Sequence, residues 1–542
     1  MTDTENLKQL FPGANEIPPE HRLASPVHQR TYLVGGEFRT WGGECKTVLS
    51  PICERQADGS VRQLEIGSYP VMGEAESDAA LDAAVSAYDN GRGEWPTMPV
   101  AKRIACMQDF VRQMVAQRQE IVNLIMWEIG KSLADSQKEF DRTVEYIVAT
   151  IEAVRTLDNN ASRFEIAEGT IGQIRRTPLG VVLCMGPYNY PLNETFATLI
   201  PALLMGNTVV FKPPQYGTLL FWPLMQAFCS AFPRGVINTI YAPGAVVVPH
   251  MLASGKIDVL ALIGSSKVAD HLKKQHPKSH RLRAVLGLDA KNAAIVLPDA
   301  DLELTVRECL LGALSFNGQR CTALKMLIVH RSLVDEFLHR ITKAVGQLKI
   351  GMPWEPGVSI TPLPGLHRTA YMTEAIEDAK AKGARVVNQG GGAYCATLYY
   401  PAVVYPVKEG MKLYREEQFG PLVPVMAYDD VEEALAYVIS SDHGQQVSVF
   451  GSDPVQIGAL VDPLVNQVCR VNLNCQCQRG PDVFPFAGRK DSAEGTLSVN
   501  DALRAFSIRS MVAARQTPAS KRLLDDIVRD HRSNFINTGF IL

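Results

Sequence analysis

The sequence predicts an α/β protein with two open, Rossmann-like parallel-sheet domains. Short apolar runs alternate with helical stretches from Gly180 to Val285, which is the βαβ pattern of a parallel sheet. A second series of the same kind runs from Asn292 to about Val468. With 542 residues, the chain is also too long for one small domain. Open sheets of this kind bind ligands outside the carboxyl ends of their strands, so we expect a shared cleft.

The elements before the first series are expected in a simple order. Residues 1–30 are polar and rich in proline, so they predict an irregular arm. A strand and turn are expected at 32–37, and helices at 78–90 and 100–159. The segment 164–176 alternates and contains two glycines, which is typical of a β-hairpin.

Composition excludes several functional classes. The net charge is -3, so the chain lacks the excess of positive charge that is typical of nucleic-acid-binding proteins. We expect neither a membrane span nor a secretory signal, because no apolar run is long enough and the first residues lack the signal pattern. Eleven scattered cysteines favour reduced thiols and a cytoplasmic protein. The Cys-Gln-Cys at 475–477 lacks metal-ligand spacing, so we expect no metal site.

The segment 315–322, Ser-Phe-Asn-Gly-Gln-Arg-Cys-Thr, places Cys321 directly after Arg320. A nearby permanent cation stabilises the thiolate, which is the reactive form of cysteine. A lone cysteine is more often a small buried hydrophobe. Two other segments raise the expectation that Cys321 is a nucleophile.

The first of them is Pro-Tyr-Asn-Tyr-Pro-Leu at 187–192, which follows an apolar run at 181–185. The second is 207–214, where a strand delivers Lys212 into a loop with two prolines. Together with the cysteine segment, these motifs resemble the aldehyde dehydrogenase superfamily, and within it most closely the non-phosphorylating glyceraldehyde-3-phosphate dehydrogenases. The resemblance runs from about Tyr32 to about Ala514.

The resemblance implies the aldehyde dehydrogenase fold, with a small β oligomerisation arm beside the two sheet domains and a homodimer or homotetramer. It also implies domain boundaries: an N-terminal arm at 1–30, a cofactor-binding domain at 31–159 and 180–286, the oligomerisation arm at 160–179 and 495–514, a catalytic domain at 287–494, and a C-terminal extension at 515–542.

Covalent catalysis is implied by the same likeness. Cys321 would attack the aldehyde, and the Asn189 amide with the Cys321 backbone N–H would stabilise the alkoxide. In Glu-Glu-Gln-Phe-Gly-Pro at 416–421, Glu417 would bind the nicotinamide ribose and Phe419 would pack near the ring.

One departure concerns the general base. The family carries a glutamate in a Leu-Glu-Leu-Gly-Gly-Lys motif, but this chain has Gly287 at that position. Asp289 lies about 7 Å further along an extended strand and is a candidate substitute, with a purely structural role as the alternative. Another glutamate, an unassisted water or an acceptor such as coenzyme A stays open.

The cofactor is expected to be NADP, with NAD as the alternative. The turn Gly264-Ser265-Ser266 follows an apolar strand and precedes a helix, so its N-terminus could bind phosphate. Lys212 resembles the lysine that contacts the adenosine ribose. Gln215 replaces a glutamate that would repel a 2′-phosphate.

The substrate is expected to be a small phosphorylated aldehyde. Arg320, Arg479 and Tyr190 match positions that bind the phosphate of glyceraldehyde 3-phosphate, and Arg155 is a further candidate. The sequence therefore predicts NADP-dependent oxidation to 3-phosphoglycerate. A semialdehyde whose carboxylate meets the same arginines is the alternative substrate. A nucleotide-binding scaffold without turnover is the alternative from another class.

Overall fold

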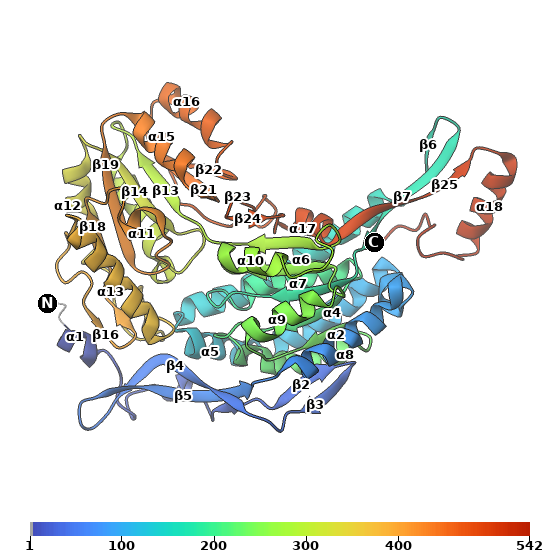
Figure 1. Ribbon diagram of the computed structural model, residues 1–542, viewed down its shortest axis with the longest axis horizontal. Helices are drawn as coiled ribbons and strands as arrows, with labels where there is room; N and C mark the ends of the chain where they lie inside the picture. Colours follow the sequence, from blue (N-terminus) through green and yellow to red (C-terminus); the bar gives the residue numbers. More distant parts are fainter. Residues whose placement is uncertain (1–3, 542) are drawn as a thin grey trace.

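The computed structural model describes residues 4–541, and its two largest sheets are mostly parallel and covered on both faces by helices (Figure 1). The first sheet has the strand order β10-β9-β8-β11-β12-β24. Its strands are β10 (Ile237–Thr239), β9 (Thr208–Lys212), β8 (Val181–Met185), β11 (Val259–Ile263), β12 (Arg283–Gly287) and β24 (Ala493–Glu494). All pair in parallel except β24, which is antiparallel to β12.

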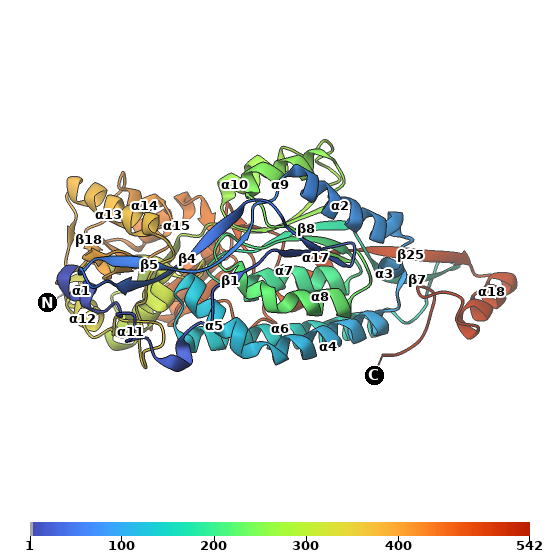
Figure 2. The same cartoon turned by 90° about the horizontal axis from the view of Figure 1, so that it is seen from below.

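Burial on both faces explains why these strands are apolar throughout. Every residue of β8 is buried, as in central strands of a parallel sheet. Figure 2 shows α2, α9 and α10 on one side of the sheet and α4, α7 and α8 on the other. Their bounds are α2 (Glu74–Tyr88), α4 (Val100–Ala116), α7 (Asn193–Leu204), α8 (Met225–Ala231), α9 (Gly244–Ala253) and α10 (Ser266–Lys273). The long helix α6 (Leu133–Asn160) packs beside α7 and follows α5 (Arg118–Ile129).

The second sheet has the order β15-β18-β19-β14-β13-β21-β22. Its strands are β15 (Arg385–Val386), β18 (Ala402–Tyr405), β19 (Leu422–Tyr428), β14 (Leu324–His330), β13 (Asn292–Val296), β21 (Gln446–Phe450) and β22 (Arg470–Leu473). One face packs against α11 (Leu302–Leu314) and α12 (Val334–Val345), and the other against α13 (Leu366–Ala381), α15 (Val431–Ser440) and α16 (Pro454–Leu464).

An antiparallel arm projects from the first sheet domain (Figure 1). It has the order β25-β7-β6, with β25 (Ser507–Arg515), β7 (Thr170–Pro178) and β6 (Glu165–Ala167). Strand β25 is paired along its whole length with β7, and Ile508 and Met511 on it are 47% and 59% exposed. The C-terminal helix α18 (Pro518–Arg529) lies at the far end of the arm.

Two expectations from the sequence are wrong in detail. The strand expected near 495–514 begins only at Ser507, because α17 (Val499–Ala505) occupies the first part. Ser498 caps that helix by accepting from the Asp501 backbone N–H. The arm at 1–30 is also not wholly irregular, since it contains α1 (Thr4–Gln9), a 3₁₀ turn at Pro19–His21 and β1 (Val27–His28).

An N-terminal hairpin of β4 (Cys45–Arg55) and β5 (Val61–Pro70) runs along the side of the molecule, below the two sheet domains in Figure 1. Among the described residues, no helix combines the length and apolar character needed to cross a membrane.

Candidate active site

Cys321 lies on the connection between α11 and β14, in a loop with an unusual backbone. Phe316, Asn317 and Gly318 have successive φ angles of 50°, 56° and 70°. A Cβ at Gly318 would stand 2.6 Å from the carbonyl oxygen of Gly420, so the tight passage requires glycine. The Asn292 amide donates to the Cys321 carbonyl at 2.7 Å and fixes the end of the loop.

The thiol of Cys321 is held in its protonated form. Burial raises its pKa to about 11, and the carboxylate of Glu194 adds to the rise, while the Lys325 ammonium opposes it. The cation that acts on the thiol is therefore Lys325, which the sequence reasoning missed. The Arg320 guanidinium instead donates to the carbonyls of Leu311 and Gly312 at 3.2 and 3.0 Å.

Asn189 lies on the loop between β8 and α7, as expected for a residue at the carboxyl end of a parallel strand. Its amide Nδ2 donates to the carbonyl of Gln319 at 2.9 Å, two residues before Cys321. The residue is 5% exposed. The structure thus brings the predicted oxyanion donor and the predicted nucleophile together.

A buried ion pair supports this loop from behind. Lys131 and Glu139 contact each other, and both side chains are fully buried. Lys131 Nζ also donates to the Asn189 carbonyl at 2.8 Å. Glu139 Oε1 accepts from the backbone N–H groups of Leu192 and Asn193 at 3.0 and 3.2 Å.

Two further predicted residues, Glu417 and Phe419, contact other residues near the cysteine loop. Glu417 pairs with Lys325, and burial raises the pKa of its carboxyl group while Lys325 opposes the rise. Phe419 packs edge-on against Tyr188, with the ring centroids 5.9 Å apart. Since Glu417 also acts on the Cys321 thiol, both belong to the same site.

Asp289 has a different environment from the one expected of a base. Its Oδ2 accepts from the backbone N–H and the hydroxyl of Ser266, both at 2.8 Å. Ser265 caps α10 by accepting from the Val268 N–H. The start of α10, where a cofactor phosphate was expected near Gly264, therefore already carries one carboxylate.

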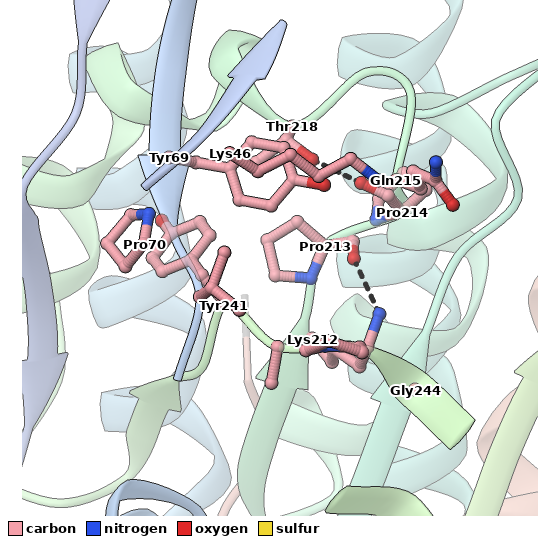
Figure 3. A pocket seen from close by; sticks show the side chains of 13 residues that line it. Lys46, Tyr69, Pro70, Lys212, Pro213, Pro214, Gln215, Thr218, Tyr241 and Gly244 are labelled. Atoms are coloured by element: carbon pink, nitrogen blue, oxygen red, sulfur yellow. Dashed lines mark hydrogen bonds between the residues drawn. The ribbon is translucent and has the colours of Figure 1, made fainter. Parts of the chain in front are cut away.

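A cavity of about 170 Å³ lies at the end of β9. Figure 3 shows Lys46 reaching from β4 toward Pro214 and Gln215, with Lys212 on the other side of Pro213. Burial, together with a smaller contribution from the charge of Lys46, lowers the pKa of Lys212 to about 8. No carboxylate is present among the described residues that line the cavity. Lys46 was not found from the sequence because it lies far from the other lining residues along the chain.

The predicted substrate arginines differ in their surroundings. Arg479 is buried, pairs with Glu194 and lies 3.3 Å from Asp482. Asp482 also accepts from Arg142 at 2.7 Å. Arg155, 13 residues further along α6, pairs with Glu152 at 3.4 Å and is not brought into this cluster.

Tyr190 lies between the nucleophile loop and the buried lysine. Its ring meets Phe316 edge-on at 5.9 Å, and Lys131 Nζ lies 3.5 Å from its centroid. Burial raises the pKa of its phenol. The phenol is therefore a neutral hydrogen-bonding group at neutral pH.

Comparison with known proteins agrees with this arrangement. The sequence profile described as "Aldehyde dehydrogenase family" matches residues 59–512. The chain belongs to the aldehyde dehydrogenase family. This confirms the resemblance and the fold class that the sequence predicted.

Three relatives of this aldehyde dehydrogenase are informative. It is 32% identical over 462 residues to the NADP-dependent glyceraldehyde-3-phosphate dehydrogenase of Streptococcus equinus, covering 84% of this chain and 93% of the relative. It is 27% identical to malonate-semialdehyde dehydrogenase 1 of Oceanobacillus iheyensis, covering 87% and 99%. The crystal structure of NADP-dependent glyceraldehyde-3-phosphate dehydrogenase from Bacillus halodurans complexed with NADP superposes with a TM-score of 0.81, at 30% identity, covering 90% and 100%.

The Lys131–Glu139 pair generates a first prediction. Lys131→Met should lower the free energy of unfolding by about 3–5 kcal/mol, because it leaves the Glu139 carboxylate buried without its counter-ion. Urea and thermal unfolding measure the loss. The double variant Lys131→Met/Glu139→Leu should recover much of the stability, since it removes both charges. A single variant as stable as the parent would contradict this account.

Proposed function

We propose that this aldehyde dehydrogenase oxidises glyceraldehyde 3-phosphate to 3-phosphoglycerate with NADP, without inorganic phosphate. The observation that carries the proposal is that the Asn189 amide binds the carbonyl of Gln319, two residues before Cys321, while the charge of Glu417 acts on the Cys321 thiol. The relative from Streptococcus equinus and the superposed structure from Bacillus halodurans are both named for this substrate and cofactor.

The chemistry would begin with loss of the Cys321 proton, because a pKa of about 11 leaves the thiol protonated at neutral pH. The thiolate would attack the aldehyde carbon. The oxygen would become an alkoxide that accepts from the Asn189 amide and the Cys321 backbone N–H. NADP, when bound, accepts a hydride. Water then hydrolyses the thioester on Cys321 and releases the acid.

The cavity beside β9 suits the 2′-phosphate end of NADP. Lys46 and Lys212 supply two ammonium groups, and Gln215 adds hydrogen-bonding capacity without negative charge. The mutual repulsion of the two lysines, expressed in the lowered pKa of Lys212, would be relieved by an anion between them.

The substrate phosphate would meet Arg479 and Tyr190, with Arg142 as an additional cation behind Asp482. Glu194 already neutralises Arg479 in the unliganded site. This feature also supports a second candidate substrate, a semialdehyde, because its single carboxylate could replace the Glu194 carboxylate beside Arg479 without a change in net charge.

The arm is proposed to bridge subunits in a homodimer or homotetramer. Support comes from β25, an edge strand that presents Ile508 and Met511 to solvent. A cytoplasmic location is proposed as well. All eleven cysteines are free thiols, which fits a reducing compartment.

Replacing the nucleophile separates an enzyme from a nucleotide-binding scaffold. Cys321→Ala should abolish aldehyde oxidation while leaving NADP affinity nearly unchanged, because the cavity beside β9 is formed by other elements. NADPH formation and NADP binding by calorimetry are the two measurements. Appreciable turnover by the purified variant would remove Cys321 from the mechanism.

Cofactor preference follows from the charges around that cavity. We expect kcat/KM to be higher with NADP than with NAD. Lys46→Ala should raise KM for NADP about tenfold or more, the loss expected for one hydrogen bond to a charged group, with little change for NAD. Gln215→Glu should shift selectivity toward NAD. Equal effects of Lys46→Ala on both cofactors would show that Lys46 does not contact the 2′-phosphate.

Recognition of the phosphate can be tested by comparing two substrates. Arg479→Ala should raise KM for glyceraldehyde 3-phosphate far more than KM for glyceraldehyde, because a charge-assisted contact acts only when the phosphate is present. The ratio of the two KM values is unaffected by the fraction of protein that folds. An unchanged ratio would make Arg479 purely structural.

A further inference from the structure

Thioester hydrolysis needs a base, and the position that carries one in the family is filled differently here. Gly287 ends β12, and a Cβ there would stand 3.4 Å from Leu497 Cδ1 and 3.5 Å from Ile263 Cγ1. The surroundings of this position are therefore apolar. The Asp289 carboxylate is engaged by two donors of Ser266.

Another carboxylate, that of Glu194, is better placed relative to the nucleophile. Glu194 is the second residue of α7, five residues after Asn189, and its N–H donates to the Tyr190 carbonyl at 3.1 Å. Its side chain is 9% exposed. Of the charged groups that act on the Cys321 thiol, Glu194 has the largest effect, ahead of Lys325 and Glu417. Tyr190, whose carbonyl accepts from the Glu194 N–H, packs edge-on against Phe316 at 5.9 Å, so the start of α7 lies beside the loop that carries Cys321.

A chain of contacts also links Glu194 to the vacant base position. Glu194 pairs with Arg479, and Arg479 Nη2 donates to the Leu497 carbonyl at 3.3 Å. The Leu497 side chain in turn packs beside Gly287. Glu194 and the family position of the base are thus connected through Arg479 and Leu497.

We propose that Glu194 is the general base for hydrolysis of the Cys321 thioester, and that its pairing with Arg479 restrains it until an anionic group of the substrate binds Arg479. The inference rests on the thioester step of the proposed function. The released carboxylate removes a proton from water while the water oxygen bonds to the thioester carbon. The tetrahedral intermediate then collapses, the carbon–sulfur bond breaks, and the sulfur leaves as a thiolate. The product is a carboxylic acid, and Glu194 passes its proton to the thiolate or to solvent.

Arg479 would keep partners when Glu194 is altered or released. It lies 3.3 Å from Asp482 and stacks on Phe486 with the guanidinium carbon 4.7 Å from the ring centroid. Glu194→Gln removes the basic group but keeps an amide oxygen beside Arg479, which also retains the Asp482 carboxylate that it shares with Arg142. The variant is a suitable probe of chemistry rather than of folding.

The test follows one turnover by rapid mixing with NADP and glyceraldehyde 3-phosphate. Glu194→Gln should form about one NADPH per site at a rate near that of the parent and then turn over about 10²-fold more slowly, the lower end of what a general base contributes. Trapped acyl-enzyme should accumulate and be visible by mass spectrometry of the intact protein. Glu336→Gln, which removes a carboxylate from a surface pair with Arg340 on α12, is the matched control and should behave as the parent.

Two results would overturn the inference. Unchanged steady-state turnover in Glu194→Gln would mean that another group activates the water, and slow turnover in Asp289→Asn would identify that group as Asp289. Loss of the initial NADPH formation in Glu194→Gln would place Glu194 before acylation, as the base that deprotonates Cys321.

A second assay tests the role of Glu194 without the aldehyde substrate. p-Nitrophenyl acetate acylates a reactive cysteine without cofactor, and the acetyl group carries no anion to bind Arg479. Inorganic phosphate should then accelerate deacylation of the parent several-fold by pairing with Arg479, but not that of Glu194→Gln. Equal acceleration of both proteins would refute release of Glu194. If the parent fails to oxidise glyceraldehyde 3-phosphate, the proposed function fails while this assay still tests Glu194.

Discussion

The buried pair of Lys131 and Glu139 holds the loop that carries Asn189 in place. Burial lowers the pKa of Lys131, and the adjacent Glu139 carboxylate opposes that shift. Burying two isolated charges would lower the stability of the folded protein. Here each charged side chain also forms hydrogen bonds with backbone groups of the same loop. Lys131 binds the carbonyl of Asn189, and Glu139 binds the N–H groups at the start of α7. The oxyanion donor is therefore positioned by helices α5 and α6, and not only by the strand that precedes it.

Other charged side chains of the site are also paired with groups of opposite charge. Lys325 pairs with Glu417, and Arg479 pairs with Glu194. Burial has the largest effect on the Cys321 thiol and keeps it protonated. A protonated thiol is poorly reactive toward oxidants.

Much of the fold was predictable because central strands of parallel sheets are apolar on both faces. The runs that became β8 and β9 are uninterrupted and end at proline or glycine, so their type and order could be read directly. The helix α17 was missed although its Ser-x-x-Asp start was visible, because a strand was expected there by family likeness.

The site was predictable only where one motif supplied both position and chemistry. Cys321, Asn189 and Glu417 are of this kind. Pairings between residues far apart in the sequence were not predictable. Nothing in the sequence around Glu194 indicates that it pairs with Arg479, and nothing around Lys46 indicates that it lines a cavity with Lys212. On α6, two arginines 13 residues apart point to different faces, since each residue turns the helix by about 100°. Sequence reasoning considered Arg155, whereas Arg142 faces the pocket through Asp482.

Gly287, at the end of β12, contacts the segment that carries Leu497. The Leu288 N–H donates to the Ser492 carbonyl at 2.9 Å, which ties the end of this strand to the segment that carries Leu497. Leu497 then covers Gly287 with its side chain and binds Arg479 with its carbonyl. A glutamate at Gly287 would have to enter space that Leu497 borders. The residue that borders Gly287 therefore also binds the arginine paired with Glu194, and the Glu194 carboxylate acts on the Cys321 thiol from α7.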